Sequence, residues 1–155
     1  MKINLTINGK EKEFEIAPDD YLSEVLRREG LLGVKKGCDT ESCGLCTIHL
    51  DDVAVLSCGT LAAKAHGKTV TTIEGVEKKA EKIRYELGKR GVDQCGFCAP
   101  GTIMSILYLE KVVKDPTEEE IIRYLKGNFC RCSGYVGQLE AIKSYLEGQK
   151  HEVCE

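Results

Sequence analysis

The chain has 155 residues, with 22 basic against 25 acidic side chains. It lacks tryptophan and has no basic stripe with interleaved aromatic residues, so its composition gives no support to nucleic-acid binding. No apolar run approaches the roughly 20 residues that span a bilayer, and the N-terminus lacks the apolar region of a secretory signal. We therefore expect a cytoplasmic protein without a membrane partner.

The first half of the chain has the alternation of apolar and polar residues that is typical of β-strands. Residues 2–8 alternate, Asn8-Gly9 is a strong signal for a tight turn, and Phe14 continues the pattern on a second arm. A short helix, a hairpin and a last strand are expected at residues 18–30, 47–55 and 69–73.

From Val76 the apolar residues recur with the period of amphipathic helices. Thr117 and Glu120 form a capping box that marks the start of one of them. The sequence therefore predicts the α+β class, with one domain at residues 1–75 and a four-helix bundle at residues 76–155. The four helices are expected over residues 76–87, 100–113, 118–127 and 135–146.

Nine cysteines are too many to be incidental in a chain of this length. Such a number indicates either a disulfide framework or metal ligation, and a reducing cytosol favours metal ligation. Each half is too small to depend on apolar burial alone, so a metal centre in each would supply stability. Cys154 and the histidines, which show no ligand spacing, remain without a role.

The first cysteine group is Cys38-x4-Cys43-x2-Cys46, the spacing of plant-type ferredoxins that bind a 2Fe–2S cluster. Three thiolates must surround one side of a small anionic centre. This requires a tight loop whose backbone N–H groups point toward the sulfurs, and glycines give the backbone the freedom to form such a loop. Cys58 is expected as the fourth ligand, although a lone downstream cysteine also fits a core position. A zinc site is the rival, but zinc more often pairs two C-x2-C motifs.

The second group is Cys95-x2-Cys98 with Cys130-x-Cys132, a spacing that also fits zinc. Pro100 indicates a helix that starts just after Cys98, and the last helix follows Cys132. Both pairs are therefore expected at helix N-termini, where unpaired N–H groups and the helix dipole favour negative charge. An anionic 2Fe–2S cluster suits that placement.

Four segments together resemble the iron–sulfur subunit of the molybdenum hydroxylase family, which includes xanthine dehydrogenases, aldehyde oxidoreductases and carbon monoxide dehydrogenases. They are GCDTESCGLCTI, TTIEGV, QCGFCAPG and GNFCRCSGY, and the similarity covers nearly the whole chain. The resemblance implies a ferredoxin-like β-grasp domain followed by a helical domain, with one 2Fe–2S cluster in each. It implies cluster ligands at Cys38, Cys43, Cys46, Cys58, Cys95, Cys98, Cys130 and Cys132.

In this family a large subunit carries the molybdopterin–molybdenum centre, and a medium subunit often carries FAD. The resemblance therefore implies a subunit that relays single electrons from the molybdopterin centre to FAD or to an external acceptor. It also places Gln94 and Cys132 beside the molybdopterin, although Gln94 alone would be an ordinary loop residue. A free-standing two-cluster ferredoxin and a structural zinc-binding module are the alternatives. The substrate is chosen elsewhere, so no substrate pocket is expected on this chain.

The chain departs from the usual family pattern at several loop positions. Glu41 and Leu45 replace a glycine and an alanine, and Gly59 replaces a bulkier apolar residue after Cys58. A carboxylate beside an anionic cluster would disfavour the reduced state. Alternatively, the side chain of Glu41 points into solvent. Both possibilities are open at the level of sequence.

Overall fold

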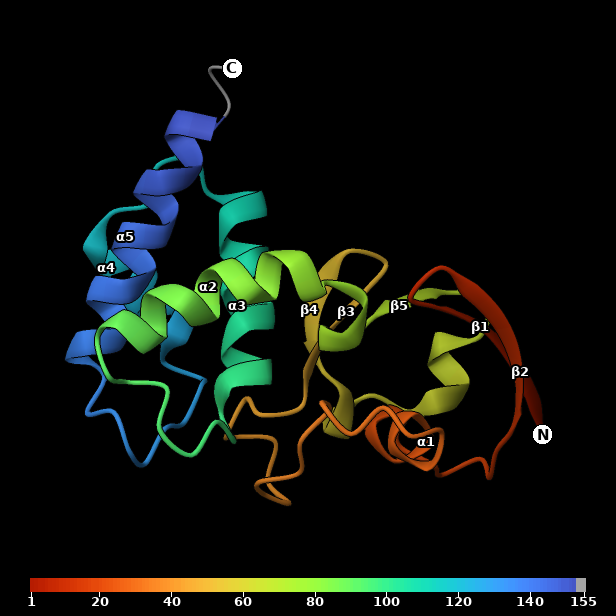
Figure 1. The fold of residues 1–155 in the computed structure, drawn as a ribbon. Coiled ribbons are helices and arrows are strands. Elements are labelled where there is room, and N and C mark those ends of the chain that lie inside the picture. The colour runs from red at the N-terminus through yellow and green to blue at the C-terminus, as the bar shows by residue number, and fades with distance from the viewer. Residues whose placement is uncertain (153–155) are drawn as a thin grey trace.

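The structure is a computed structural model that describes residues 1–152, with side chains through residue 149, so Cys154 and the side chain of His151 lie outside the described part. A β-sheet with one helix forms one end of the molecule and four helices form the other (Figure 1). The strands are β1 (Lys2–Ile7), β2 (Lys10–Glu15), β3 (Thr47–Leu50), β4 (Val53–Leu56) and β5 (Thr69–Thr71). The α-helices are α1 (Leu22–Arg28), α2 (Glu77–Lys89), α3 (Ala99–Val112), α4 (Glu118–Leu125) and α5 (Val136–Glu152).

The five strands form one mixed sheet in the order β2-β1-β5-β3-β4. β1 pairs in parallel with β5, and the other neighbours are antiparallel. The two hairpins turn at Asn8-Gly9 and Asp51-Asp52, where both central residues have positive φ, the geometry that joins twisted strands closely. The predicted α+β class and both hairpins are confirmed. The predicted last strand is shorter than expected, because a 3₁₀ turn (Ile73–Gly75) replaces its end.

The apolar residues form two separate cores. One lies between the sheet and α1 and includes Leu5, Leu26 and Ile48, all 1% exposed or less. The other lies among the four later helices, where α3 contributes most of its length and is apolar on several sides. This central position explains why α3 carries few charged residues, since a helix surrounded by protein needs no polar face. None of the described helices has the length and apolar character that a membrane span requires.

The sheet and the helices are joined by contacts of β3 and the first cysteine loop with α3. On β3, the buried His49 lies edge-on to Tyr108, and its Nε2 donates a hydrogen bond of 2.8 Å to the carbonyl of Met104. Burial lowers the pKa of His49, so its neutral form is favoured at this junction. Gly101 lies so close to the loop that a Cβ atom there would be 2.4 Å from the carbonyl oxygen of Gly44. The two halves are therefore fixed against each other by direct backbone packing.

Candidate iron–sulfur sites

The first cysteine loop lies between α1 and β3 and turns its backbone N–H groups toward sulfur. The Cys38 sulfur accepts hydrogen bonds from the backbone N–H groups of Thr40, Ser42 and Cys43, which lower the pKa of this thiol to about 6. These donors stabilise a thiolate, the form of cysteine that binds iron. The loop therefore prepares at least one of its sulfurs for ligation.

The tight turn of this loop depends on residues in the left-handed region. Glu41 has φ 56° and Gly44 has φ 70°. At Gly44 a side chain is also excluded by space, because a Cβ atom would lie 2.2 Å from the carbonyl oxygen of Gly127. The sequence expectation of a glycine-dependent loop is confirmed at this position.

Cys46 and Cys58 face each other from either side of the hairpin of β3 and β4. Cys46 is buried just before β3, and Cys58 lies half-buried in a 3₁₀ turn (Ser57–Gly59) after β4. The hydroxyl of Ser57 donates a hydrogen bond of 2.7 Å to the carbonyl of Cys46, which ties the two segments together. Burial, followed by the thiol groups of Cys46 and Cys38, raises the pKa of Cys58 to about 12. The downstream cysteine thus joins the other three, and it does not stand alone in the core.

The second group lies where the loops before α3 and α5 meet. Cys98 is the N-cap residue of α3, and the Sγ atoms of Cys95 and Cys132 are 3.6 Å apart. Burial, then the neighbouring thiols of Cys130 and Cys95, raises the pKa of Cys98 to about 12. The expected position at a helix N-terminus holds for Cys98. Cys132 precedes the first residue of α5 by several positions, because Ser133, Gly134 and Tyr135 form a turn between them.

Cys130 is the buried member of the second group and has its own set of donors. Burial opposes ionisation of this thiol, but the hydroxyl and N–H groups of Ser133 and the N–H of Cys132 outweigh it and lower the pKa of Cys130. The N–H of Cys130 is itself held by the phenol oxygen of Tyr135, at 2.9 Å. Ser133 and Tyr135 are therefore supporting residues of this site that the spacing of cysteines could not identify.

Each group of four cysteines divides into two close pairs. The thiols interact as Cys38 with Cys43, Cys46 with Cys58, Cys98 with Cys130, and Cys95 with Cys132. Among the described side chains, no three His, Cys, Asp or Glu residues are arranged to hold a single metal ion. A tetrahedral zinc site would need four sulfurs at about 2.3 Å from one point. Two pairs per group instead suit a cluster of two irons, each of which takes two thiolates.

The two sites are joined through the protein backbone. The N–H of Phe129, which precedes Cys130, donates a hydrogen bond of 2.8 Å to the carbonyl of Cys43. Beside it, the side-chain amide of the buried Asn128 donates to the carbonyl of Gly44 at 3.1 Å. Cys43 of the first group is therefore linked by a single hydrogen bond to Phe129, the residue next to Cys130 of the second group.

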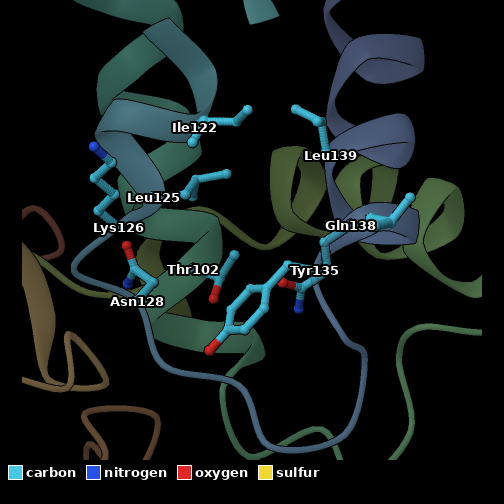
Figure 2. Close-up of a pocket in the computed structure, with 9 residues that line it drawn as sticks. Thr102, Ile122, Leu125, Lys126, Asn128, Tyr135, Gln138 and Leu139 are labelled. Atoms are coloured by element: carbon cyan, nitrogen blue, oxygen red, sulfur yellow. The ribbon is translucent and has the colours of Figure 1, made fainter. Parts of the chain in front are cut away.

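The surface around the second group is partly apolar and open. Cys95, Cys132 and Gln94 are exposed, and Gln94 makes a long hydrogen bond from Nε2 to the carbonyl of Gly91. An apolar pocket of about 420 Å³ opens nearby between α3, α4 and the start of α5 (Figure 2). Figure 2 shows Ile122 and Leu125 of α4 facing Leu139 of α5 across it, with Tyr135 at its lower end. Exposed apolar side chains on these elements and on the loops that precede them include Phe97, Ile122, Phe129, Tyr135 and Val136.

Comparison with known proteins gives matches along almost the whole chain. A 2Fe-2S iron-sulfur cluster binding domain matches residues 5–72, and a [2Fe-2S] binding domain matches residues 72–143. The chain is 46% identical over 137 residues to the xanthine dehydrogenase iron-sulfur-binding subunit of Escherichia coli O157:H7, covering 86% of each chain. It is 39% identical to the nicotine 6-hydroxylase small subunit of Paenarthrobacter nicotinovorans, covering 92% of this chain and 87% of that one.

Solved structures also match almost the whole chain. Quinoline 2-oxidoreductase from Pseudomonas putida 86 matches with a TM-score of 0.88 and 34% identity, over 97% of this chain and 96% of that chain. Aldehyde oxidoreductase from Desulfovibrio gigas matches with a TM-score of 0.89 and 34% identity, over 98% of this chain but only 17% of that chain. With both cysteine groups assembled and both iron–sulfur domains matched, the chain belongs to the family of iron–sulfur small subunits of molybdenum hydroxylases.

Proposed function

We propose that each thiol pair holds one iron, so that Cys38, Cys43, Cys46 and Cys58 bind the first 2Fe–2S cluster. Cys95, Cys98, Cys130 and Cys132 bind the second. The observation that carries this assignment is the division of both groups into two close pairs, with N–H or hydroxyl donors directed at Cys38 and Cys130. When bound, a 2Fe–2S cluster accepts and releases one electron at a time.

The chain's own residues serve this electron transfer by holding the two sites at a fixed separation. The hydrogen bond from Phe129 to Cys43 and the close packing of Gly101 on the cysteine loop join the two halves directly. Donors to the sulfurs stabilise the anionic form of the ligands and so contribute to the reduction potentials. A direct connection of this kind favours a constant distance between the two cluster sites.

The chain is divided, in this proposal, into a β-grasp domain at residues 1–75 and a four-helix bundle at residues 76–155. Two separate apolar cores and the strand order of the sheet support this division. The cytoplasm is its proposed location, since free thiols of this number persist in a reducing compartment.

The electron donor in this proposal is a large subunit that carries molybdopterin and molybdenum. Gln94 and Cys132 would face that cofactor, and their exposure supports this orientation. In the aldehyde oxidoreductase of Desulfovibrio gigas the matching part belongs to a much longer chain, as expected of a domain that packs against a larger protein. A medium subunit with FAD is the proposed next acceptor.

A free-standing ferredoxin is the second candidate, and the surface argues against it. A soluble shuttle should be polar on all sides, whereas Val136 is 69% exposed, Phe129 51% and Phe97 45%, beside an apolar pocket. These side chains suit an interface that is buried in a complex. Purification of the native protein should therefore yield it together with a much larger subunit.

The ligand assignment is tested by Cys98→Ser in the native complex, with Cys154→Ser as the matched control outside both groups. Loss of one thiolate of the second site should remove one of the two EPR signals of the reduced clusters and stop reduction of the acceptor by substrate. The control should keep both signals. Two unchanged signals in Cys98→Ser would contradict the assignment.

A further inference from the structure

Glu41 and Gly59 meet in space although they lie in different segments. The Glu41 side chain folds back from its loop and rests on the backbone of Gly59. A Cβ atom on residue 59 would lie 2.5 Å from Oε2 and 2.6 Å from Cδ of Glu41. The missing side chain at residue 59 therefore makes room for the carboxylate, so the position of the Glu41 side chain depends on Gly59.

This position brings a negative charge next to the first cluster site. Gly59 directly follows Cys58, and Glu41 itself lies on the loop that carries Cys38 and Cys43. Within the part of the chain that the structure describes, Glu41 forms no ion pair, and Lys36 of the same loop is paired with Asp39 at 3.2 Å. Among the described residues the carboxylate thus has no ionic partner, and it is exposed to solvent while it lies against Gly59.

We propose that Glu41, seated on Gly59, sets the reduction potential of the first cluster by holding it below the value that the same site would have without this charge. The proposal rests on the proposed assignment of Cys58 as a ligand of that cluster. The reason is electrostatic: reduction adds an electron to a centre that is already anionic, and a fixed negative charge a few residues away makes that addition less favourable.

The size of the effect follows from the exposure of the carboxylate. Because Glu41 is exposed at the surface, water and salt weaken its field. At a fixed ambient potential, we expect removal of the charge to raise the ratio of reduced to oxidised first cluster by about tenfold. For a one-electron couple this corresponds to a rise of about 59 mV in the midpoint potential. The difference should become smaller as the ionic strength rises.

The test is a potentiometric titration of both clusters, followed by EPR, in the native complex. Glu41→Gln removes the charge and keeps the shape, and it should raise the midpoint potential of one cluster only. The other cluster of the same molecule is an internal reference. Glu119→Gln, an exposed carboxylate on α4, is the control for a general change in surface charge and should move neither potential.

Gly59→Ala tests the location of the charge without removing it. The added methyl group would displace the end of the Glu41 side chain, which is flexible, so the fold should be retained. The potential of the same cluster should rise in this variant. In the Glu41→Gln background the same substitution should add little, because no charge is left to displace.

Two results would overturn the proposal while leaving the proposed function intact. One is an unchanged pair of potentials in Glu41→Gln with both clusters loaded. The other is a shift in the midpoint potential of the first cluster that is equally large for Gly59→Ala in the native background and in the Glu41→Gln background. Such a result would assign the effect to the backbone beside Cys58. Absence of any reducible 2Fe–2S signal in the unmodified protein would instead refute the cluster assignment itself.

Discussion

At the scale of single residues, Asn128 shows how a side chain outside the ligand set holds a cluster loop in place. It is 6% exposed, and its amide reaches across the two halves to the carbonyl of Gly44. The order of cysteines in the sequence predicts the two ligand groups, but not this contact, because nothing local marks a partner 84 residues away. The pairing of thiols within each group is equally invisible to spacing, since it depends on how the loop folds.

Asn128→Ala should destabilise the cluster-loaded protein by about 1–2 kcal/mol, measured by denaturant unfolding. The carbonyl of Gly44 keeps the hydroxyl of Thr47 as a donor at 2.7 Å, so no buried acceptor is left unpaired and the cost stays near that of one hydrogen bond. Asn4→Ala, at an exposed position, should change the free energy of unfolding by less than about 0.5 kcal/mol. Equal effects of both substitutions would contradict a bridging role for Asn128.

At the scale of elements, the helix boundaries could largely be predicted from the sequence, because caps and apolar period are local. Thr117 and Glu120 form the expected capping box in the structure, and Pro100 lies in the first turn of α3. The apolar period predicts that the last helix ends near Leu146, but α5 continues to Glu152. That extension lacks the apolar positions on which the prediction depended, so periodicity alone could not reveal it.

Gly101→Ala tests the packing of α3 on the first cysteine loop. Alanine favours a helix over glycine by about 1 kcal/mol, so an isolated helix would be stabilised. Here the new Cβ would lie 2.4 Å from the Gly44 carbonyl and 2.9 Å from Cα of Leu45, which are backbone atoms that cannot move without the loop. We therefore expect a net loss of about 1–3 kcal/mol in unfolding free energy and weaker binding of the first cluster.

The matched control for this substitution is Gly88→Ala on α2. No atom lies within 4 Å of the position that its Cβ would take, so the greater helix propensity of alanine should be the only contribution to the change in unfolding free energy. The control should gain about 0.5–1 kcal/mol in denaturant unfolding. If Gly101→Ala stabilised the protein as much as Gly88→Ala does, the close approach between α3 and the loop would be refuted.

At the scale of the whole molecule, two small apolar cores are joined across a junction of backbone contacts, and each half of the chain carries one cysteine group. The α+β class and the two cysteine groups could be predicted from the sequence. The junction could not be predicted from the sequence. The contacts of Gly44 with Gly101 and of Cys43 with Phe129 join distant segments, and no repeating pattern of apolar residues marks them. In the proposed function electron transfer depends on that junction, because it holds one cluster site against the other.

The content of iron and acid-labile sulfide in anaerobically prepared native protein tests the central claim most directly. Two 2Fe–2S clusters per chain predict about four irons and about four sulfides per polypeptide. A preparation with two irons or fewer and no labile sulfide, or one that holds zinc in their place, would contradict it.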